Sequence, residues 1–227
     1  MKKILISTIF CLFTLIVVRT SVFAAIPKST TKNFGSLMND YFAETNSYAV
    51  INKNGDDISN AFYLDNIKSY QSSDYNSIES YTLKNVSCFS KTTITKAANL
   101  GVPNAFTTRH ISKEDSYIAS AKSSVYDDKI KIKCFVTLSA SFTYNFTTGK
   151  ITGCSDPTLS FDYDTMDFEN LTELNVRTDN ISTESSVSSD KYSVTFSSNY
   201  DVIGTYLTFD DLTFAKNKRI TMTGTPE

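Results

Sequence analysis

The only histidine of this 227-residue chain, His110, limits the chemistry that the chain can perform. Zinc sites draw on several His or Cys ligands at short spacing, and no cysteine lies near His110 in the sequence. A Ser-His-Asp triad would need His110 as its base, yet no G-x-S-x-G segment supplies the serine. We interpret the surrounding segment, 108–115, as an exposed polar connection. We therefore expect no catalytic residue, no metal ligand and no cofactor, in a protein that is not an enzyme.

One possible nucleophile has a partial resemblance to a known family. The chain order His110, Cys154, Arg177 is similar to that of sortases, which are small secreted β-barrel transpeptidases with a cysteine nucleophile. The segment Ile151-Thr152-Gly153-Cys154 also looks like their strand-end Thr-x-Cys. The resemblance implies a catalytic Cys154, but it covers only these few residues. Arg177 also lies farther downstream than that family places its arginine, so we keep the non-catalytic interpretation.

Three cysteines follow residue 24, namely Cys88, Cys134 and Cys154. In an exported protein one disulfide is expected, with one thiol left over. A hairpin that turns near Thr148 would leave Cys154 and Cys134 about eight residues out of register. That offset is far beyond the Cα separation of under ~7 Å that a disulfide tolerates. Cys88 then pairs with Cys134 or Cys154, and we favour Cys134; the alternative is three reduced cysteines, with Cys134 in the core.

Three aspartates, Asp162, Asp164 and Asp167, form a D-x-D-x-x-D cluster that could present oxygens to Ca²⁺. An EF-hand loop also needs a glycine and a later glutamate at fixed offsets, and both are missing here. Asp162 and Asp164 share the polar side of an alternating segment. We therefore interpret the cluster as a solvated strand end that discourages edge-to-edge pairing.

The first 24 residues have the pattern of a secretory signal peptide. Lys2 and Lys3 precede an apolar run over 4–18, and the residues up to Ala24 resemble the site that a signal peptidase cleaves. The run is about 15 residues long, shorter than the ~20 that a membrane-spanning helix needs. We expect cleavage after residue 24 or 25, a flexible polar N-terminus over 25–33, and one domain over 34–227. The protein is then secreted and extracellular.

The charge of the expected mature chain is acidic. Removing Lys2, Lys3 and Arg19 reduces the 22 basic residues to 19 against 24 acidic ones, a net charge of −5. Such a balance disfavours nucleic acid and anionic lipid as partners, because both need basic surfaces. The abundance of Asn, Lys, Ile and Tyr, with no Trp, is typical of an AT-rich bacterial genome. We expect an extracellular or cell-envelope macromolecule as the partner.

The elements that must carry these residues are mostly strands. From Ile130 to Phe146 apolar residues occupy every second position, and only Phe135 is apolar on the other parity. Side chains in a strand alternate between faces, so this is a long strand with one apolar face and one wet face. A half-wet strand belongs to antiparallel architecture, because parallel sheets are buried on both faces.

Other segments extend this picture. An apolar stripe at helical spacing predicts one N-terminal helix, formed by Phe34, Leu37, Met38, Tyr41 and Phe42. A strand over 48–51 with an Asn54-Gly55 turn follows. We predict irregular strands at 62–70 and 78–95, a strand at 117–125 paired with the long strand, and a return at 151–163 interrupted by Pro157. A further strand is predicted near 171–178. A polar link over 180–190 then leads to a strand at 192–202, and Gly204 resets the alternation before the last strand.

The count of roughly eight to ten strands predicts an all-β fold, an antiparallel β-sandwich of two packed sheets with one short N-terminal helix. A surface rich in Ser, Thr and Tyr favours binding of a cell-envelope or other extracellular component. The alternative is a membrane-active, pore-forming or antimicrobial protein that uses the 129–163 hairpin as a transmembrane element. Membrane contact is expected only under that alternative, and the oligomeric state stays open.

Overall fold

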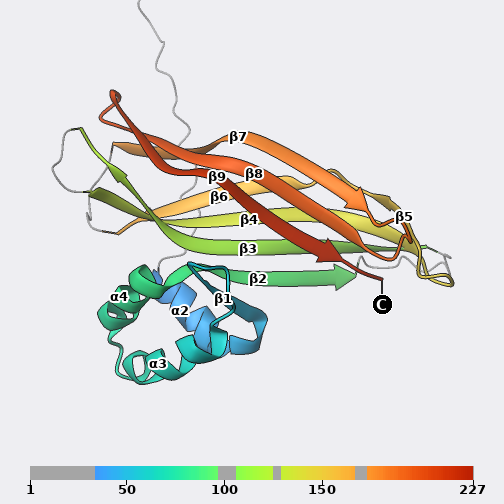
Figure 1. Ribbon diagram of the computed structural model, residues 1–227, viewed down its shortest axis with the longest axis horizontal. Helices are drawn as coiled ribbons and strands as arrows, with labels where there is room; N and C mark the ends of the chain where they lie inside the picture. Colours follow the sequence, from blue (N-terminus) through green and yellow to red (C-terminus); the bar gives the residue numbers. More distant parts are fainter. Residues whose placement is uncertain (1–33, 97–105, 125–128, 167–172, 227) are drawn as a thin grey trace, which may run out of the picture. The chain divides into compact units, whose positions relative to one another are not determined.

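The computed structural model describes residues 34–96, 106–124, 129–166 and 173–226 (Figure 1). The predicted signal peptide over 1–24, the N-terminus over 25–33 and Asp167 lie outside these residues. The described helices are α2 (Phe34–Ala43), η1 (Thr45–Ser47), α3 (Ser59–Gln71) and α4 (Tyr75–Asn85). The described strands are β1 (Tyr48–Asn52), β2 (Val86–Lys96), β3 (Phe106–Lys122), β4 (Lys129–Asn145), β5 (Ile151–Cys154), β6 (Thr158–Thr165), β7 (Leu174–Val187), β8 (Val194–Tyr206) and β9 (Asp210–Gly224).

The strands form two antiparallel sheets that pack together. The larger sheet has the order β1-β2-β3-β4-β5, and β6 also pairs with β4. The smaller sheet has the order β7-β8-β9. Apolar residues from both sheets belong to one buried cluster, which we call the inter-sheet core. The predicted antiparallel β-sandwich is therefore confirmed.

Strand β4 shows the predicted alternation along its whole length. The residues of one parity are buried, from Ile130 through Tyr144, and face the smaller sheet. We call this side of the larger sheet its inner face. On the outer face only Phe135 is buried among the residues of β4. Phe146 lies just beyond the strand and is 71% exposed.

The register of the hairpin after β4 matches the sequence prediction. Phe142 pairs with Cys154, so Cys154 is eight positions from the level of Cys134. Pro157 separates β5 from β6, as expected for a residue that cannot donate to a strand ladder. Strand β6 then pairs with β4 over Ile132–Ser139, with Leu159 opposite Leu138.

The end of β9 lies close against the ring of Phe142 of β4. A Cβ built on Gly224 would lie 2.5 Å from Cε1 of Phe142. Only glycine fits at such a separation, because real Cβ contacts are longer. The glycine at the end of β9 therefore lets the ring of Phe142, 1% exposed, close this end of the core.

Helices α2, α3 and α4 form a second layer that we call the helical cap. The buried face of α2 comprises Phe34, Leu37, Met38 and Tyr41, which confirms the predicted N-terminal helix. These side chains join a second apolar cluster with Phe62, Ile78, Phe89 and Phe135. The ring of Phe62 packs edge-on against Tyr41 and Phe89, with centroids 5.2 and 5.1 Å apart. The cap thus covers outer-face residues at one end of the larger sheet.

The prediction of a strand at 62–70 is wrong, and so is the first half of the strand predicted at 78–95. These segments form α3 and α4, so the described residues contain three α-helices rather than one. The sequence did not indicate these helices because polar residues occupy some of their buried positions. Asn66 is buried and donates from Nδ2 to the carbonyl of Phe62 at 2.8 Å. Thr82 is likewise buried and donates to the carbonyl of Ile78 at 2.8 Å, so neither helix shows an apolar stripe.

Two predictions on the smaller sheet are also wrong. The segment 180–187, interpreted as part of a polar link, continues β7 to Val187. Strand β7 is at an edge of its sheet and is largely exposed beyond Val176, so its polar residues show no alternation. Gly204 does not reset the parity of β8, because Val202, Gly204 and Tyr206 are all buried in alternation.

Candidate functional site

A cavity of about 440 Å³ lies between the helical cap and the strands β3, β4 and β9. Its lining contains five lysines and, among the described residues, no aspartate or glutamate. We call it the lysine cavity, and its lysines are Lys53, Lys129, Lys131, Lys133 and Lys218. A concentration of positive charge in a chain of net charge −2 is the most distinctive chemical feature of the described molecule.

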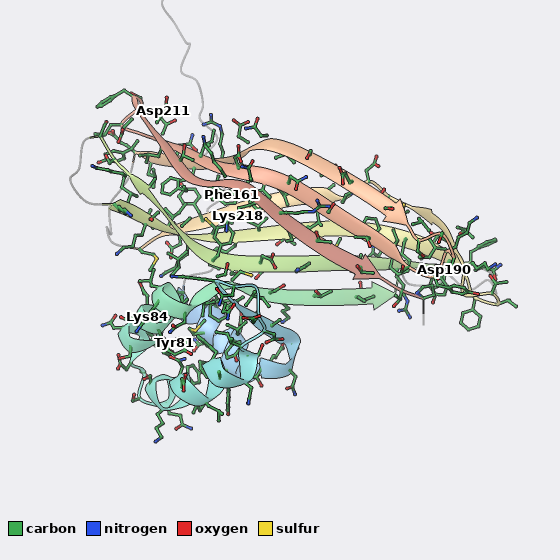
Figure 2. All side chains as sticks on the ribbon, in the orientation of Figure 1. Tyr81, Lys84, Phe161, Asp190, Asp211 and Lys218 are labelled. Atoms are coloured by element: carbon green, nitrogen blue, oxygen red, sulfur yellow. The ribbon has the colours of Figure 1, made fainter. Side chains whose placement is uncertain are left out.

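Three parts of the chain supply the lysines of the cavity, namely β4, β9 and the turn after β1. Lys129, Lys131 and Lys133 lie at alternate positions of β4, so they project together from the outer face. Lys218 belongs to β9 and lies opposite the buried Tyr200, which places it on the side facing the larger sheet (Figure 2). Lys53 follows β1 directly, and its Nζ donates to the carbonyl of Leu83 at 3.0 Å. That carbonyl lies in the last turn of α4, where carbonyls lack helical partners and attract cations.

The remaining walls of the cavity are largely apolar. Phe34 and Leu37 come from α2, Leu83 from α4, and Phe135 from β4. The Nζ of Lys133 lies 5.1 Å from the centroid of the Phe34 ring. An ammonium over a ring face is held by the ring quadrupole. The cavity therefore combines cationic groups with apolar surface, which suits a ligand that carries negative charge on a partly apolar body.

Four of the five lysines of the cavity are not neutralised by described carboxylates. Among the described residues, Lys53, Lys129, Lys133 and Lys218 form no ion pair within 4.0 Å. Ion pairs are formed at Lys91–Glu44, Lys113–Asp115 and Arg219–Glu184, and none of these residues lines the cavity. The positive charge of these four lysines is thus available to a ligand.

One wall of the cavity is the edge of a strand. Tyr117, Ile118, Ala119 and Ser120 all line it, although consecutive residues of a strand point to opposite faces. Because residues that point to both faces of the sheet line the cavity here, the cavity must lie against the backbone edge of β3. On the inner side of this edge the Nζ of Lys218 lies 4.7 Å from the centroid of the Tyr117 ring.

Behind this edge, the space between the sheets contains a small group of ionisable side chains. Lys113 donates to the carbonyl of Thr221 at 3.0 Å and lies 3.8 Å from Asp115. Burial raises the pKa of Asp115, and the Lys113 charge opposes that rise. Burial also raises the pKa of Cys88 to about 11 and that of Cys134 to about 12. Both thiols are therefore protonated at neutral pH and are poor nucleophiles.

The structure contains no Cys88–Cys134 disulfide, so that prediction is wrong. Both thiols are free, as is that of Cys154. Strand β3 lies between β2 and β4, and Tyr117 of β3 pairs with Cys134. Two strand spacings amount to about 9.6 Å, which exceeds the ~7 Å limit for bridged Cα atoms. The alternative of three reduced cysteines, with Cys134 in the core, describes the structure.

His110 lies within β3 and not in a connection, which corrects the sequence interpretation. Its side chain is exposed, as expected, and its Nδ1 lies 2.7 Å from Oγ of Ser141 on the neighbouring strand. The two residues are directly opposite each other in the β3–β4 register. No described carboxylate is hydrogen-bonded to the ring of His110, so the pair is a cross-strand contact on a wet sheet face.

The three residues of the sortase resemblance are not brought together. Cys154 lies opposite the inward-facing Phe142, whereas His110 projects from the outer face of the sheet. The Sγ of Cys154 contacts Oγ of Ser185 at 3.7 Å. Arg177 is eight residues from Ser185 on the same strand, a separation of roughly 25 Å.

The described members of the aspartate cluster lie on β6, at an edge of the larger sheet. Asp162 pairs with Phe135 and Asp164 with Lys133. Among the described residues, no group of three or more His, Cys, Asp or Glu side chains is placed to hold a metal ion.

Comparisons with protein-family models, with curated proteins and with solved structures found no match to this chain. Within the described part of the chain, no helix has both the length and the apolar character that crossing a membrane requires.

The lysine cavity was not predicted from the sequence. The spacing Lys129-x-Lys131-x-Lys133 on the polar side of the long strand was the available signal, because it predicts a row of charge on one face. Lys53 and Lys218 lie far away in sequence. Only the packing of the cap and of β9 against the edge of β3 reveals that they belong to the same site.

Proposed function

We propose that this protein is an exported, non-catalytic binding protein that holds a negatively charged component of the cell envelope or of the surrounding medium in the lysine cavity. The observation that carries the proposal is a cavity with five lysines, no described carboxylate in its lining, and walls formed by Phe34, Leu37 and Phe135. Export rests on the signal-peptide pattern of residues 1–24.

The lining groups support binding rather than catalysis. They are ammonium, hydroxyl, apolar and backbone groups, together with the thiol of Cys134, whose pKa burial raises to about 12. General acid–base catalysis needs a group whose pKa lies near the working pH. Ammonium groups arranged around an apolar surface instead favour an anion by charge and by desolvation of its apolar part.

The proposal is tested with anilinonaphthalene sulfonate, a fluorescent apolar anion, added to the protein that begins at residue 25. We expect saturable binding with one site, weakened at least fivefold by the double substitution Lys129→Gln/Lys133→Gln. Both lysines line the cavity and form no ion pair with described carboxylates. Raising the ionic strength should weaken dye binding to the wild type more than dye binding to the variant. Salt screens the two lysine charges that the wild type has and the variant lacks.

Lys150→Gln is the matched control, because Lys150 is exposed in the turn between β4 and β5 and does not line the cavity. It should leave the affinity unchanged. Dye binding that responds equally to both substitutions, or that is absent, would contradict the proposal.

A second candidate function is favoured by one observation, a group of exposed aromatic residues at one end of the sandwich. Phe106, Phe146 and Tyr192 are 51%, 71% and 48% exposed. The two hairpin turns that carry Phe146 and Tyr192 adjoin, since Ile151 donates from its backbone to the carbonyl of Lys191 at 2.8 Å. Aromatic rings beside lysines favour a membrane interface, so membrane contact, as in the pore-forming alternative, is retained as a proposal.

This candidate is tested by dye release from vesicles that contain anionic lipid. Refolding of the 129–163 hairpin would expose the eight buried inner-face residues of β4, from Ile130 to Tyr144. Leakage that Phe146→Ser abolishes would support the membrane-active function. The absence of leakage at micromolar protein removes the pore-forming function and leaves the binding proposal intact.

A further inference from the structure

Strand β3 has an edge that no described strand covers. It pairs with β4 over its full length, from Phe106–Asn145 to Lys122–Lys129. On its other side it pairs with β2 only from Arg109 to Ser116. Within the described part of the chain, the segment Tyr117–Lys122 therefore presents backbone N–H and C=O groups to no strand on that side. Such an edge is a template for an additional strand.

The cause of this open edge is the helical cap. The chain leaves α4 at Asn85 and enters β2 at Val86. The first residues of β2 pair with β1 through Cys88–Ile51 and Val86–Asn52, where the register shifts. The space beside Tyr117–Ser120 is thus left to the lysine cavity, with Thr82 and Leu83 of α4 on its far side.

Positive charge lies on both faces of the sheet at this edge. Lys129, Lys131 and Lys133 project from the outer face of β4, across β3 from the edge. Lys218 lies on the inner side, near the ring of Tyr117. Side chains of a strand added to the edge would alternate between these two faces. Acidic side chains on either parity would therefore meet lysines.

We infer that the lysine cavity binds an extended acidic polypeptide segment of a partner protein, which adds as a strand to the Tyr117–Lys122 edge of β3. This inference rests on the proposed function, since it names the class of ligand that the cavity holds. Six residues of strand extend about 20 Å. The backbone hydrogen bonds give affinity without regard to sequence, and the lysines select for acidic side chains.

The alternative occupant within the chain is its own segment over 25–33, which precedes Phe34 of the cavity lining. That segment contains Lys28 and Lys32 and no acidic residue. Like charges would oppose its binding beside five lysines. Charge complementarity therefore favours a separate, acidic partner.

The test uses an acetylated, amidated hexapeptide of sequence Asp-Val-Glu-Val-Asp-Thr as the probe, titrated calorimetrically into the protein that begins at residue 25. The matched control is the same peptide with alternate backbone amides N-methylated on the edge that would pair. Methylation preserves every charge and side chain but removes the donors that strand addition needs. We expect the unmodified peptide to bind at least tenfold more tightly than the methylated one, and Lys129→Gln/Lys133→Gln to weaken its binding tenfold.

The outcomes separate the inference from the proposed function. Equal affinity for the two peptides would overturn strand addition but leave an anion-binding cavity. Failure of both peptides, while anilinonaphthalene sulfonate still binds with lysine dependence, would overturn the polypeptide ligand alone. If neither peptide binds and the lysine variant self-associates in sedimentation, the lysines only guard the edge against aggregation, and the inference is wrong.

Discussion

The inter-sheet core and the helical cap bury apolar residues in two different ways. In the core, whole strand faces interdigitate, and inner-face residues of β4 such as Ile132 and Leu138 are fully buried. In the cap, a few large rings carry the packing, with Phe62 contacting Tyr41, Phe89 and Tyr81 at centroid distances from 5.1 to 5.6 Å. The core is a regular pattern repeated over many residues, whereas the cap depends on single anchors.

This difference places the candidate ligand site. Where two regions with unlike geometry meet, their surfaces cannot interdigitate completely, and the lysine cavity occupies that junction. Beside the cap, β2 pairs with β1 and leaves part of β3 unpaired with any other described strand on that side. The site is therefore formed by the junction and belongs to neither region alone.

The largest expected effect comes from a substitution in the inter-sheet core. Phe142→Ala removes a ring that is 1% exposed, and we expect the free energy of unfolding to fall by about 3–5 kcal/mol. Ser139→Ala, on the outer face of the same strand, should change it by less than about 0.5 kcal/mol. Denaturant unfolding measures both values. Similar values for the two variants would mean that β4 does not have one buried and one wet face.

The core should also be labile to alkali. The pKa of Cys134 is raised from 9.0 to about 12 by burial, and the pKa values of Tyr117 and Tyr200 are raised in the same direction. Because the folded state favours the neutral thiol, its stabilising contribution is complete below pH 9 and is lost as the pH rises toward 12. Each pKa unit is worth about 1.4 kcal/mol, so Cys134 accounts for up to about 4 kcal/mol.

Unfolding free energies measured from pH 8 to 11 check this expectation. Cys134→Val removes one titrating group at similar volume, so its stability should fall less steeply with pH than that of the wild type. A stability that is constant over this range would contradict the burial of these groups.

Thiol reactivity distinguishes the same regions without unfolding. Cys154 is exposed and should react first with a disulfide reagent at pH 8, while the raised pKa of Cys88, about 11, leaves roughly one thiol in a thousand ionised. We expect one fast thiol, one at least a hundredfold slower, and no reaction of the buried Cys134. In denaturant the protein beginning at residue 25 should titrate three thiols. A single thiol there would mean that two of the cysteines form a disulfide, which would contradict the three free thiols of the structure.

The smallest expected effect concerns the turn that leads into the cap. Gly55 has φ of +91°, a conformation that other residues rarely adopt. Gly55→Ala should lower the free energy of unfolding by about 1 kcal/mol through backbone strain alone, because nothing lies within 4 Å of the added methyl group. Gly153→Ala is the control, since its surroundings are equally open and its φ is not positive. Equal effects of both substitutions would show that strain at Gly55 is not responsible.

The strands of the inter-sheet core could be predicted from the sequence better than the helical cap. The alternation of β4 follows from period-two patterning. The position of the turn near Thr148 gives the register that pairs Phe142 with Cys154, and the missing N–H of Pro157 explains the interruption before β6. The helices α3 and α4 were missed because Asn66 and Thr82 fill helical positions with polar side chains that bond to the preceding turn. The lysine cavity was missed because Lys53, Lys133 and Lys218 converge only through the packing of distant elements.

Amide hydrogen exchange of Tyr117–Lys122 tests the central claim most directly, since these residues form the edge that the ligand is proposed to cover. With a saturating amount of the unmodified acidic hexapeptide, the exchange of alternate amides in this segment should slow at least tenfold, while that of Arg109–Ser116, already paired with β2, should stay the same. Unchanged exchange along Tyr117–Lys122 with the peptide bound would contradict the account, because the ligand would then be held somewhere other than the edge of β3.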